Sequence, residues 1–298
     1  MRRLWQGLND WRRLLQEAAN ASRRAAAARA AGNTPDSAES ELHAIQLGDT
    51  EVHLRVRHGP PVPKSVPLAL PSAARPRLRY LNLHENEQAS VEAASALLQH
   101  QPGTLIELRA GGGRLVTFRA GWRPYAFDPN RIFTDAGLRA TLRQHGSDTP
   151  LARAAVQDLR DAVLALLADV AALPDTPDTP DTPDLPVVAL HNNGAGRYSV
   201  QAYAAGGAHA RDAQAVTVNP ALSPQDFFLV TRRSLFDGLR ASGFNVVLQS
   251  EHPADDGSLA VWFQQHGRAY VNVEALHGHR QEQQRMLAAV AALSLATR

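Results

Sequence analysis

A short polar stretch, His84-Glu85-Asn86-Glu87, follows an apolar run and precedes an alanine-rich segment with helical periodicity. This pattern predicts a strand that ends at a turn carrying one imidazole and two carboxylates. Because His84 and Glu87 are three positions apart, both side chains can face one point from a strand-end turn or a first helical turn. Imidazole nitrogens and carboxylate oxygens gathered at one point are ligands for a divalent transition metal.

Two later strands are also predicted to end in side chains that could join this point. One apolar run leads into His191, and another leads into Glu274. Strands that alternate with helices, each strand a continuous apolar run, predict an α/β protein with a mixed, mostly parallel, twisted sheet and helices on both faces. In such sheets ligands gather beyond the carboxyl ends of the strands. We therefore expect His84, Glu87 and His191 to lie together.

The donor set of two imidazoles and one carboxylate favours a catalytic zinc site. It leaves one position of a tetrahedral Zn²⁺ ion open for water, and Glu274 is the candidate base for the proton of that water. The chain has no cysteine, which excludes disulfides, iron–sulfur clusters and thiolate zinc sites. We expect one Zn²⁺ ion per chain. A His-x-x-Glu pair alone is weak support, because the pair often arises by chance.

Further residues follow in an order that resembles the zinc carboxypeptidase superfamily, most closely its succinylglutamate desuccinylase/aspartoacylase branch. That family has a strand-end His-x-x-Glu, an arginine, an Asp-x-Asn-Arg-x-Phe stretch, a strand-end histidine and a strand-borne glutamate. The resemblance covers about residues 77–275 and implies a zinc carboxypeptidase-like fold. The matching residues in this chain are His84, Glu87, Arg123, Asp128, Asn130, Arg131, Phe133, His191 and Glu274.

The resemblance implies a role for each matching side chain. His84, Glu87 and His191 would hold zinc, and Glu274 would be the general base and acid. Arg123 would polarise the scissile carbonyl, a kind of interaction that can be worth ~3–4 kcal/mol.

Substrate binding would fall to a second group of residues. By the resemblance, Asn130 and Arg131 would grip a substrate carboxylate, which a planar guanidinium binds through two hydrogen bonds. Arg197 and Tyr198, just after the second histidine, could add a contact to a substrate carboxylate or hydroxyl. Without the family order, Asn130 and Arg131 could instead simply close a turn after Pro129.

The sequence departs from the family at two positions beside the site. Glu85 stands where the family often has glycine and would add negative charge beside the metal. Ala189 stands where the desuccinylase branch commonly has aspartate, so hydrogen-bond support for His191 must come from elsewhere or be weaker.

Two functions from different classes follow from these residues. The first is a zinc hydrolase that cleaves an amide next to a free carboxylate, either a carboxypeptidase acting on short peptides, cell-wall peptides included, or a deacylase acting on N-acyl amino acids. The alternative is a non-catalytic zinc-binding or scaffold protein of the same fold. A nucleic-acid partner is not expected, because the net charge is only +2 and aromatic residues make up 6% of the chain.

The chain divides into an N-terminal segment and one larger domain. Residues 1–40 are predicted to form an amphipathic helix and a linker, and the helix could pack on the domain or contact a partner or an anionic membrane surface. Residues 41–298 form the predicted catalytic domain, in which the Asp-Thr-Pro repeat at 174–186 is an exposed loop. No apolar run reaches the ~18 residues of a transmembrane helix, and no export signal is visible, so we expect a cytoplasmic protein.

The remaining expectations concern individual elements. Three glycines, Gly111 to Gly113, are predicted to turn a hairpin. The expected strands are 51–59, 66–71, 77–83, 185–191, 226–231, 244–249 and 269–279; the expected helices are 88–100, 135–145, 150–173, 232–243, 258–267 and 280–296; the hairpin spans 104–120 and a loop spans 121–135.

Overall fold

The structure, a computed structural model, describes residues 40–60, 78–169, 185–196 and 198–296. Four expectations lie outside these residues: the N-terminal helix within 1–40, the strand at 66–71, the Asp-Thr-Pro repeat and the contacts of Arg197.

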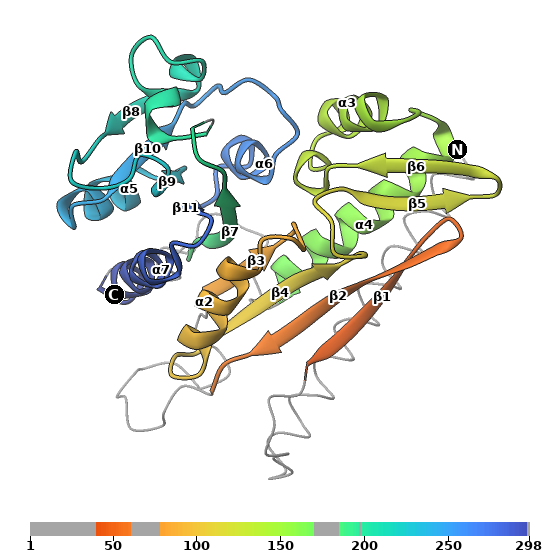
Figure 1. The fold of residues 1–298 in the computed structure, drawn as a ribbon, viewed down its shortest axis with the longest axis horizontal. Coiled ribbons are helices and arrows are strands. Elements are labelled where there is room, and N and C mark those ends of the chain that lie inside the picture. The colour runs from red at the N-terminus through yellow and green to blue at the C-terminus, as the bar shows by residue number, and fades with distance from the viewer. Residues whose placement is uncertain (1–39, 61–77, 170–184, 197, 297–298) are drawn as a thin grey trace.

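A nine-stranded sheet forms the centre of the described chain (Figure 1). Four of its eight neighbouring pairs are parallel and four are antiparallel, so the predicted mixed sheet is confirmed, whereas the predicted excess of parallel pairs is wrong. The strands are β1 (Glu41–Leu47), β2 (Thr50–His58), β3 (Leu78–Asn82), β4 (Gly103–Arg109), β7 (Val187–Asn193), β8 (Ala213–Thr217), β9 (Phe227–Val230), β10 (Asn245–Gln249) and β11 (Tyr270–Leu276). Their order is β1-β2-β4-β3-β7-β11-β9-β10-β8, and the run from β4 to β11 is parallel throughout.

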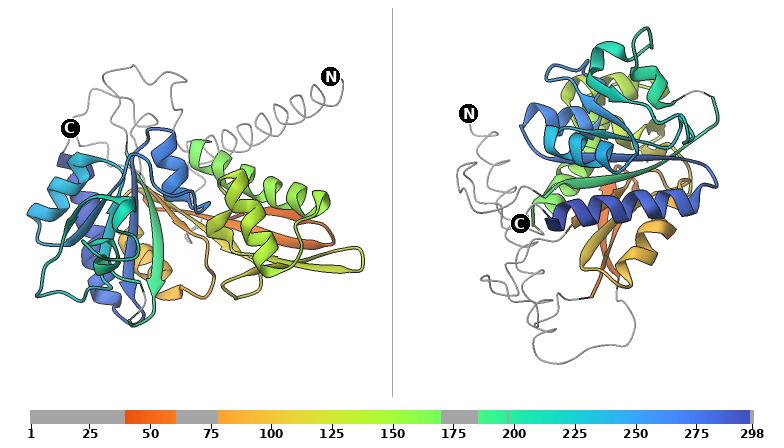
Figure 2. Two further views of the ribbon diagram at one scale, coloured as in Figure 1. Left: turned by 90° about the horizontal axis from the view of Figure 1, so that it is seen from above. Right: turned by 90° about the vertical axis from the view of Figure 1, so that its left-hand side faces the viewer.

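Helices cover both faces of this sheet, as predicted (Figure 2). The helices are α2 (Gln88–Leu98), α3 (Asp135–His145), α4 (Pro150–Asp169), α5 (Arg233–Ala241), α6 (Leu259–Gln265) and α7 (Arg280–Ala296), with short 3₁₀ turns η2 (Pro129–Arg131), η3 (Val200–Tyr203) and η4 (Ala210–Asp212). Among the described residues, no helix combines the length and the apolar character needed to span a bilayer.

Strand β7 shows why the central strands read as continuous apolar runs. Val187 and Ala189 belong to the core that contains α3, α4 and α6, whereas Val188 and Leu190 belong to the core that contains α2, α5 and α7. Successive side chains point to opposite faces of a sheet, so a strand covered on both faces must be apolar at every position. The polar residues at the end of the strand therefore stand out.

The glycine-rich segment differs from its prediction. Strand β5 (Val116–Ala120) does not pair with β4, but with β6 (Arg123–Phe127) in a separate two-stranded sheet. Both edges of β4 are already hydrogen-bonded, to β2 and to β3, so β5 has no free edge to join. Gly111 and Gly112, with φ of 99° and 85°, carry the chain out of the main sheet. The expected loop at 121–135 thus contains a strand and the turn η2.

Two glycine backbones join the segment after β6 to the loop before α6. The N–H of Phe133 donates to the carbonyl oxygen of Gly257 at 3.0 Å. A Cβ atom placed on Gly137 would lie 2.1 Å from the Cα of Gly257, and Gly257 itself has a φ of +77°. Only glycines allow these two segments to approach so closely.

We predict that Gly137→Ala destabilises the protein. Alanine is normally favoured over glycine in a helix by ~0.8–1 kcal/mol, but here the added methyl group meets backbone atoms, and overpacking costs about 1–3 kcal/mol. Urea denaturation should show a lower free energy of unfolding. Gly194→Ala is the control, because no described atom outside its two chain neighbours lies within 4 Å of its Cβ position. Equal stability of the two variants would contradict the prediction.

Candidate metal centre

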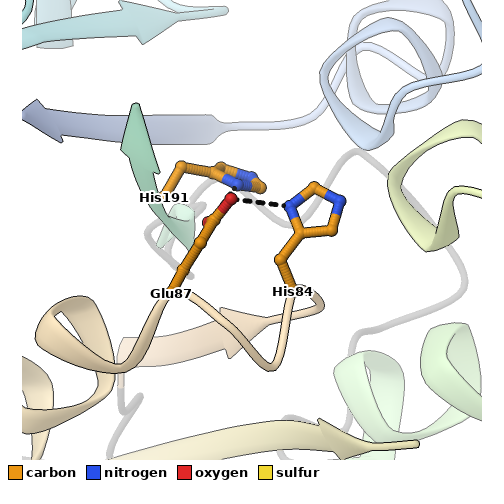
Figure 3. A group of neighbouring side chains, drawn as sticks. All are labelled: His84, Glu87 and His191. Carbon is orange, nitrogen blue, oxygen red and sulfur yellow. Dashed lines mark hydrogen bonds and ion pairs between the residues drawn. The ribbon is translucent and has the colours of Figure 1, made fainter. Parts of the chain in front are cut away.

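The residues of the predicted metal site come from two neighbouring parallel strands. His84 and Glu87 lie in the turn between β3 and α2, which is closed by a 3.0 Å hydrogen bond from the N–H of Glu87 to the carbonyl oxygen of His84. His191 lies in β7, where Ala189 is opposite Leu81 of β3. Because parallel neighbours end at the same edge of a sheet, the three side chains meet there (Figure 3).

The Glu87 carboxylate lies between the two imidazoles. Its Oε1 is 3.0 Å from Nδ1 of His84, and its Oε2 is 3.0 Å from Nδ1 of His191. One donor atom of each residue lies within 4.8 Å of the other two, and all three side chains are buried. The predicted convergence of His84, Glu87 and His191 is confirmed.

The donor atoms of this group fit a metal ion. Among the described residues, the buried Nδ1 of His84 has no partner in hydrogen-bond geometry, although Oε1 of Glu87 is 3.0 Å away. A buried nitrogen without a partner is unfavourable, and a bound cation would supply one. The ligands of a tetrahedral zinc ion at ~2.1 Å lie about 3.4 Å from one another. The donor atoms here lie within 4.8 Å of one another, so small side-chain movements would bring all three to an ion. The group could therefore hold a metal ion.

Asp128, at the end of β6, orients the first histidine. Its Oδ1 accepts a hydrogen bond from Nε2 of His84 at 2.8 Å, which leaves Nδ1 of the imidazole free to bind a cation. Asp128 is held in turn, since its Oδ1 accepts from the N–H of Asn130 at 2.9 Å and its own N–H donates to Oγ1 of Thr141 at 2.8 Å. A carboxylate behind a histidine is a common support for a metal ligand. The sequence motif contained Asp128 without indicating this role.

A guanidinium from the glycine-rich loop bridges two of these carboxylates. Arg114 Nη1 is 3.3 Å from Oε1 of Glu87, and its Nη2 is 3.1 Å from Oδ2 of Asp128. The side chain of Arg114 is 51% exposed, so the guanidinium is also open to solvent beside the cluster. Sequence reasoning missed Arg114; the available signal was an arginine directly after three glycines that follow a strand next to β3.

Glu85 does not face the metal centre, contrary to the expectation that it would add charge there. Its Oε2 accepts hydrogen bonds from the N–H groups of Ala110 and Gly112 at 2.8 and 2.6 Å. Its Oε1 lies 3.0 Å from Nε of Arg109. Glu85 therefore holds the base of the loop that carries Arg114.

Opposite charges set the protonation of the cluster when no metal is bound. Burial alone would lower the pKa of His84, but the hydrogen bond to Asp128 and the charge of Glu87 outweigh it and raise the pKa to about 9. Burial alone would raise the pKa of Glu87, but His191 and His84 outweigh it and lower the pKa to about 2. The metal-free cluster thus favours a protonated His84 beside an ionised Glu87.

Asn192 caps helix α2 in place of Glu87, so the Glu87 carboxylate can face the imidazoles. Glu87 is the N-cap residue of α2, yet its side chain makes no capping hydrogen bond. Oδ1 of Asn192 accepts the N–H of Ser90 at 3.0 Å instead, so a residue of β7 caps the helix. The N–H of Asn192 also donates to Oε2 of Glu87 at 3.1 Å.

Glu274 lies beside the cluster on the next strand. It is directly opposite His191 in the parallel pairing of β11 with β7, and it is 6% exposed. Its two oxygens accept hydrogen bonds from Nδ2 of Asn272 at 3.1 Å and from Nδ2 of Asn193 at 3.3 Å. Burial raises the pKa of Glu274, with His191 opposing and Glu87 adding to the shift. This buried carboxylate is placed as the sequence predicted.

The structure does not bring Arg123 to the cluster. Arg123 begins β6 at the turn of the β5–β6 hairpin, where its guanidinium lies 4.8 Å from the ring centre of Trp122. Asp128 directly follows the other end of β6, and five residues of extended strand separate the two Cα atoms by about 17 Å. Arg114 contacts the cluster from the loop before the hairpin. The pairing of β5 with β6, hidden from sequence reasoning, decides this difference.

The other predicted residues that the structure describes are Asn130, Arg131 and Tyr198. Arg131 pairs through Nη1 with Oδ2 of Asp256, and Asn130 supplies its N–H to Asp128. The hydroxyl of Tyr198 is 2.6 Å from that of Tyr203. Burial, together with the charges of Tyr203 and Glu274, raises the pKa of Tyr198, and the charge of Arg131 opposes this rise. Glu274 and Arg131 are therefore both close enough to Tyr198 to influence its hydroxyl.

Comparisons with protein families, curated proteins and solved structures found no match to this chain.

We predict that His84 stabilises the metal-free protein only below about pH 9. Its pKa in the fold is above the ordinary value of 6.5, so its contribution is complete below pH 6.5 and is lost as the pH rises through about 9. With a chelator present, the difference in unfolding free energy between wild type and His84→Gln should shrink by about 3 kcal/mol across this range. A pH-independent difference would show that His84 is neutral in the metal-free fold.

Proposed function

We propose that this chain is a zinc-dependent hydrolase that cleaves an amide bond next to a free carboxylate. The observation that carries the proposal is the buried His84, Glu87 and His191 group, with the Glu274 carboxylate opposite His191 on the adjacent strand. The resemblance of residues 77–275 to the zinc carboxypeptidase superfamily supports the same reaction class. The substrates we propose are short peptides, cell-wall peptides included, or N-acyl amino acids.

In this proposal the three ligand residues hold the metal and Glu274 moves the proton. A zinc ion at the site would act as a Lewis acid and lower the pKa of a bound water toward ~7. Glu274 takes a proton from the attacking water and returns it to the departing amine nitrogen. Its raised pKa suits both steps, because a base works best when its pKa approaches the working pH.

Arg114 takes the role first expected of Arg123. Its guanidinium is held by Glu87 and Asp128 and is half-exposed beside the ligands, where the carbonyl oxygen of a substrate would approach. As the water attacks, negative charge develops on that oxygen. A guanidinium already in place stabilises this charge without the reorganisation that water would need.

Arg131 and Asn130 are the proposed contacts for the substrate carboxylate. Pairing with Asp256 occupies one guanidinium N–H of Arg131, and a guanidinium has five N–H donors, so a second carboxylate can still bind. Tyr198 lies near enough to Arg131 and Glu274 to border the same substrate. Arg197 remains a proposed contact next to it.

The first test is metal content, with Glu274→Gln as the catalytic control. Purified wild type should contain about one zinc ion per chain, and His84→Ala and His191→Ala should lose it. Glu274→Gln should keep the metal, because its carboxylate is not a ligand, but should lose turnover of peptide and N-acyl amino acid substrates. Elemental analysis and single-substrate assays measure the two effects.

Each outcome has a distinct meaning. A wild type that neither contains zinc nor takes it up would overturn the proposed centre. Zinc binding without turnover of either substrate class would favour the non-catalytic zinc-binding or scaffold alternative. Full activity in Glu274→Gln would remove Glu274 from the base role and leave the metal centre standing.

We predict that Arg114 matters for turnover and Arg123 does not. Arg114→Gln should lower kcat by ~10²–10³, the usual effect of removing one donor to a developing oxyanion. Arg123→Gln should remain within about twofold of wild type, because about 17 Å of extended strand separates Arg123 from Asp128, the residue after β6 that lies at the cluster. The measurement is kcat and KM for both variants on the same substrate; the reverse ranking would restore Arg123 to the site.

A further inference from the structure

The C-terminal helix α7 reaches the candidate metal centre through a buried carboxamide. Gln283 is 0% exposed and lies in the first turns of α7. Its Nε2 donates a hydrogen bond to the carbonyl oxygen of His191 at 3.0 Å, and its Oε1 accepts one from Nδ2 of Asn192 at 2.8 Å. Gln283 thus forms hydrogen bonds with two consecutive residues of β7, and one of them, His191, is a candidate ligand.

Asn192 connects Gln283 to a second candidate ligand, Glu87. Its side chain is held at Nδ2 by Gln283, while its Oδ1 caps α2 at Ser90. Its N–H donates to Oε2 of Glu87 at 3.1 Å. One carboxamide on α7 therefore supports His191 through its carbonyl group and Glu87 through Asn192.

These hydrogen bonds of Gln283 are separate from the apolar packing that holds α7 on the sheet. Met286, Leu287 and Val290 of α7 are buried in the same core as Val91 and Ala94 of α2. These apolar contacts position the helix without Gln283. Loss of the carboxamide would remove this partner from the His191 carbonyl in a buried region. It would leave the Asn192 amide with only the longer hydrogen bond to the carbonyl oxygen of Ala275, at 3.4 Å, so the end of β7 would be held less firmly.

We propose that Gln283 is a positioning residue of the metal centre and that it couples the start of α7 to metal binding. The side chain fixes the end of β7, so that the donor atoms of His191 and Glu87 stay where a cation can bind both. The coupling acts in both directions. If the Gln283 hydrogen bonds strengthen metal binding, bound metal must stabilise those hydrogen bonds by the same free energy. This inference rests on the proposed metal centre.

The test compares Gln283→Met with Ser294→Ala in the full chain. Methionine is similar in length but cannot form the two hydrogen bonds. Ser294 is also buried on α7, and its Oγ donates a hydrogen bond within the helix, to the carbonyl oxygen of Val290 at 2.8 Å. Zinc affinity is measured by competition with a chelator, and the absorption spectrum of the Co²⁺-loaded protein reports the ligand geometry.

We expect Gln283→Met to bind zinc about 10- to 100-fold more weakly, the usual effect of removing a support for a metal ligand. Its Co²⁺ spectrum should change, whereas Ser294→Ala should keep both the affinity and the spectrum of wild type. A Gln283→Met variant that binds zinc as wild type does would overturn the inference and leave the metal centre intact. A wild type that binds no metal would overturn both.

Hydrogen exchange on the wild type tests the coupling without any substitution. Added zinc should slow the exchange of the backbone amides around Gln283 more than that of the amides near Ser294. If zinc slowed the exchange near Gln283 no more than the exchange near Ser294, the start of α7 would not respond to the metal. That result would overturn the coupling.

Discussion

The structure depends on keeping one charged carboxylate out of water. An ionised carboxylate costs several kcal/mol to bury unless charges and hydrogen bonds replace its water shell. Glu87, which is 1% exposed, receives the N–H of Asn192 and faces two imidazoles and the Arg114 guanidinium. These partners come from three parts of the chain, so the carboxylate holds the β3–α2 turn, β7 and the glycine-rich loop in one arrangement.

The division of labour between strands and loops follows from this arrangement. The candidate ligands and Glu274 stand at the ends of parallel strands that helices cover on both faces, and such strands move little. Arg114 and Arg131 stand on a loop and a 3₁₀ turn, each held by carboxylates and each partly exposed. Rigid strands would keep the chemistry in place, while the more exposed arginines can adapt to a substrate.

The sequence predicted the part of the site that short-range patterns encode. An apolar run that stops at a polar residue marks a strand end, and parallel strands bring their ends together, so His84, His191 and Glu274 could be placed in advance. The positions of Arg114 and Arg123 depend on whether β5 pairs with β4 or with β6, which local periodicity does not contain. The link from Gln283 to β7 spans 91 and 92 residues, so no neighbouring pattern marks it.

The two ends of the β5–β6 hairpin have different surroundings. At one end, Asp128 follows β6 and forms a hydrogen bond with Nε2 of His84. At the other end, one strand length away, lies the turn, where Trp122 is 77% exposed. Hydrogen bonds between Asp49 and the backbone of Arg119 and Gly121 hold this turn to the β1–β2 turn. The side chain of Trp122 nevertheless projects into solvent, so position 122 is a suitable place to attach a fluorescent label. Such a label would report on the protein from a site one strand length away from the candidate metal centre.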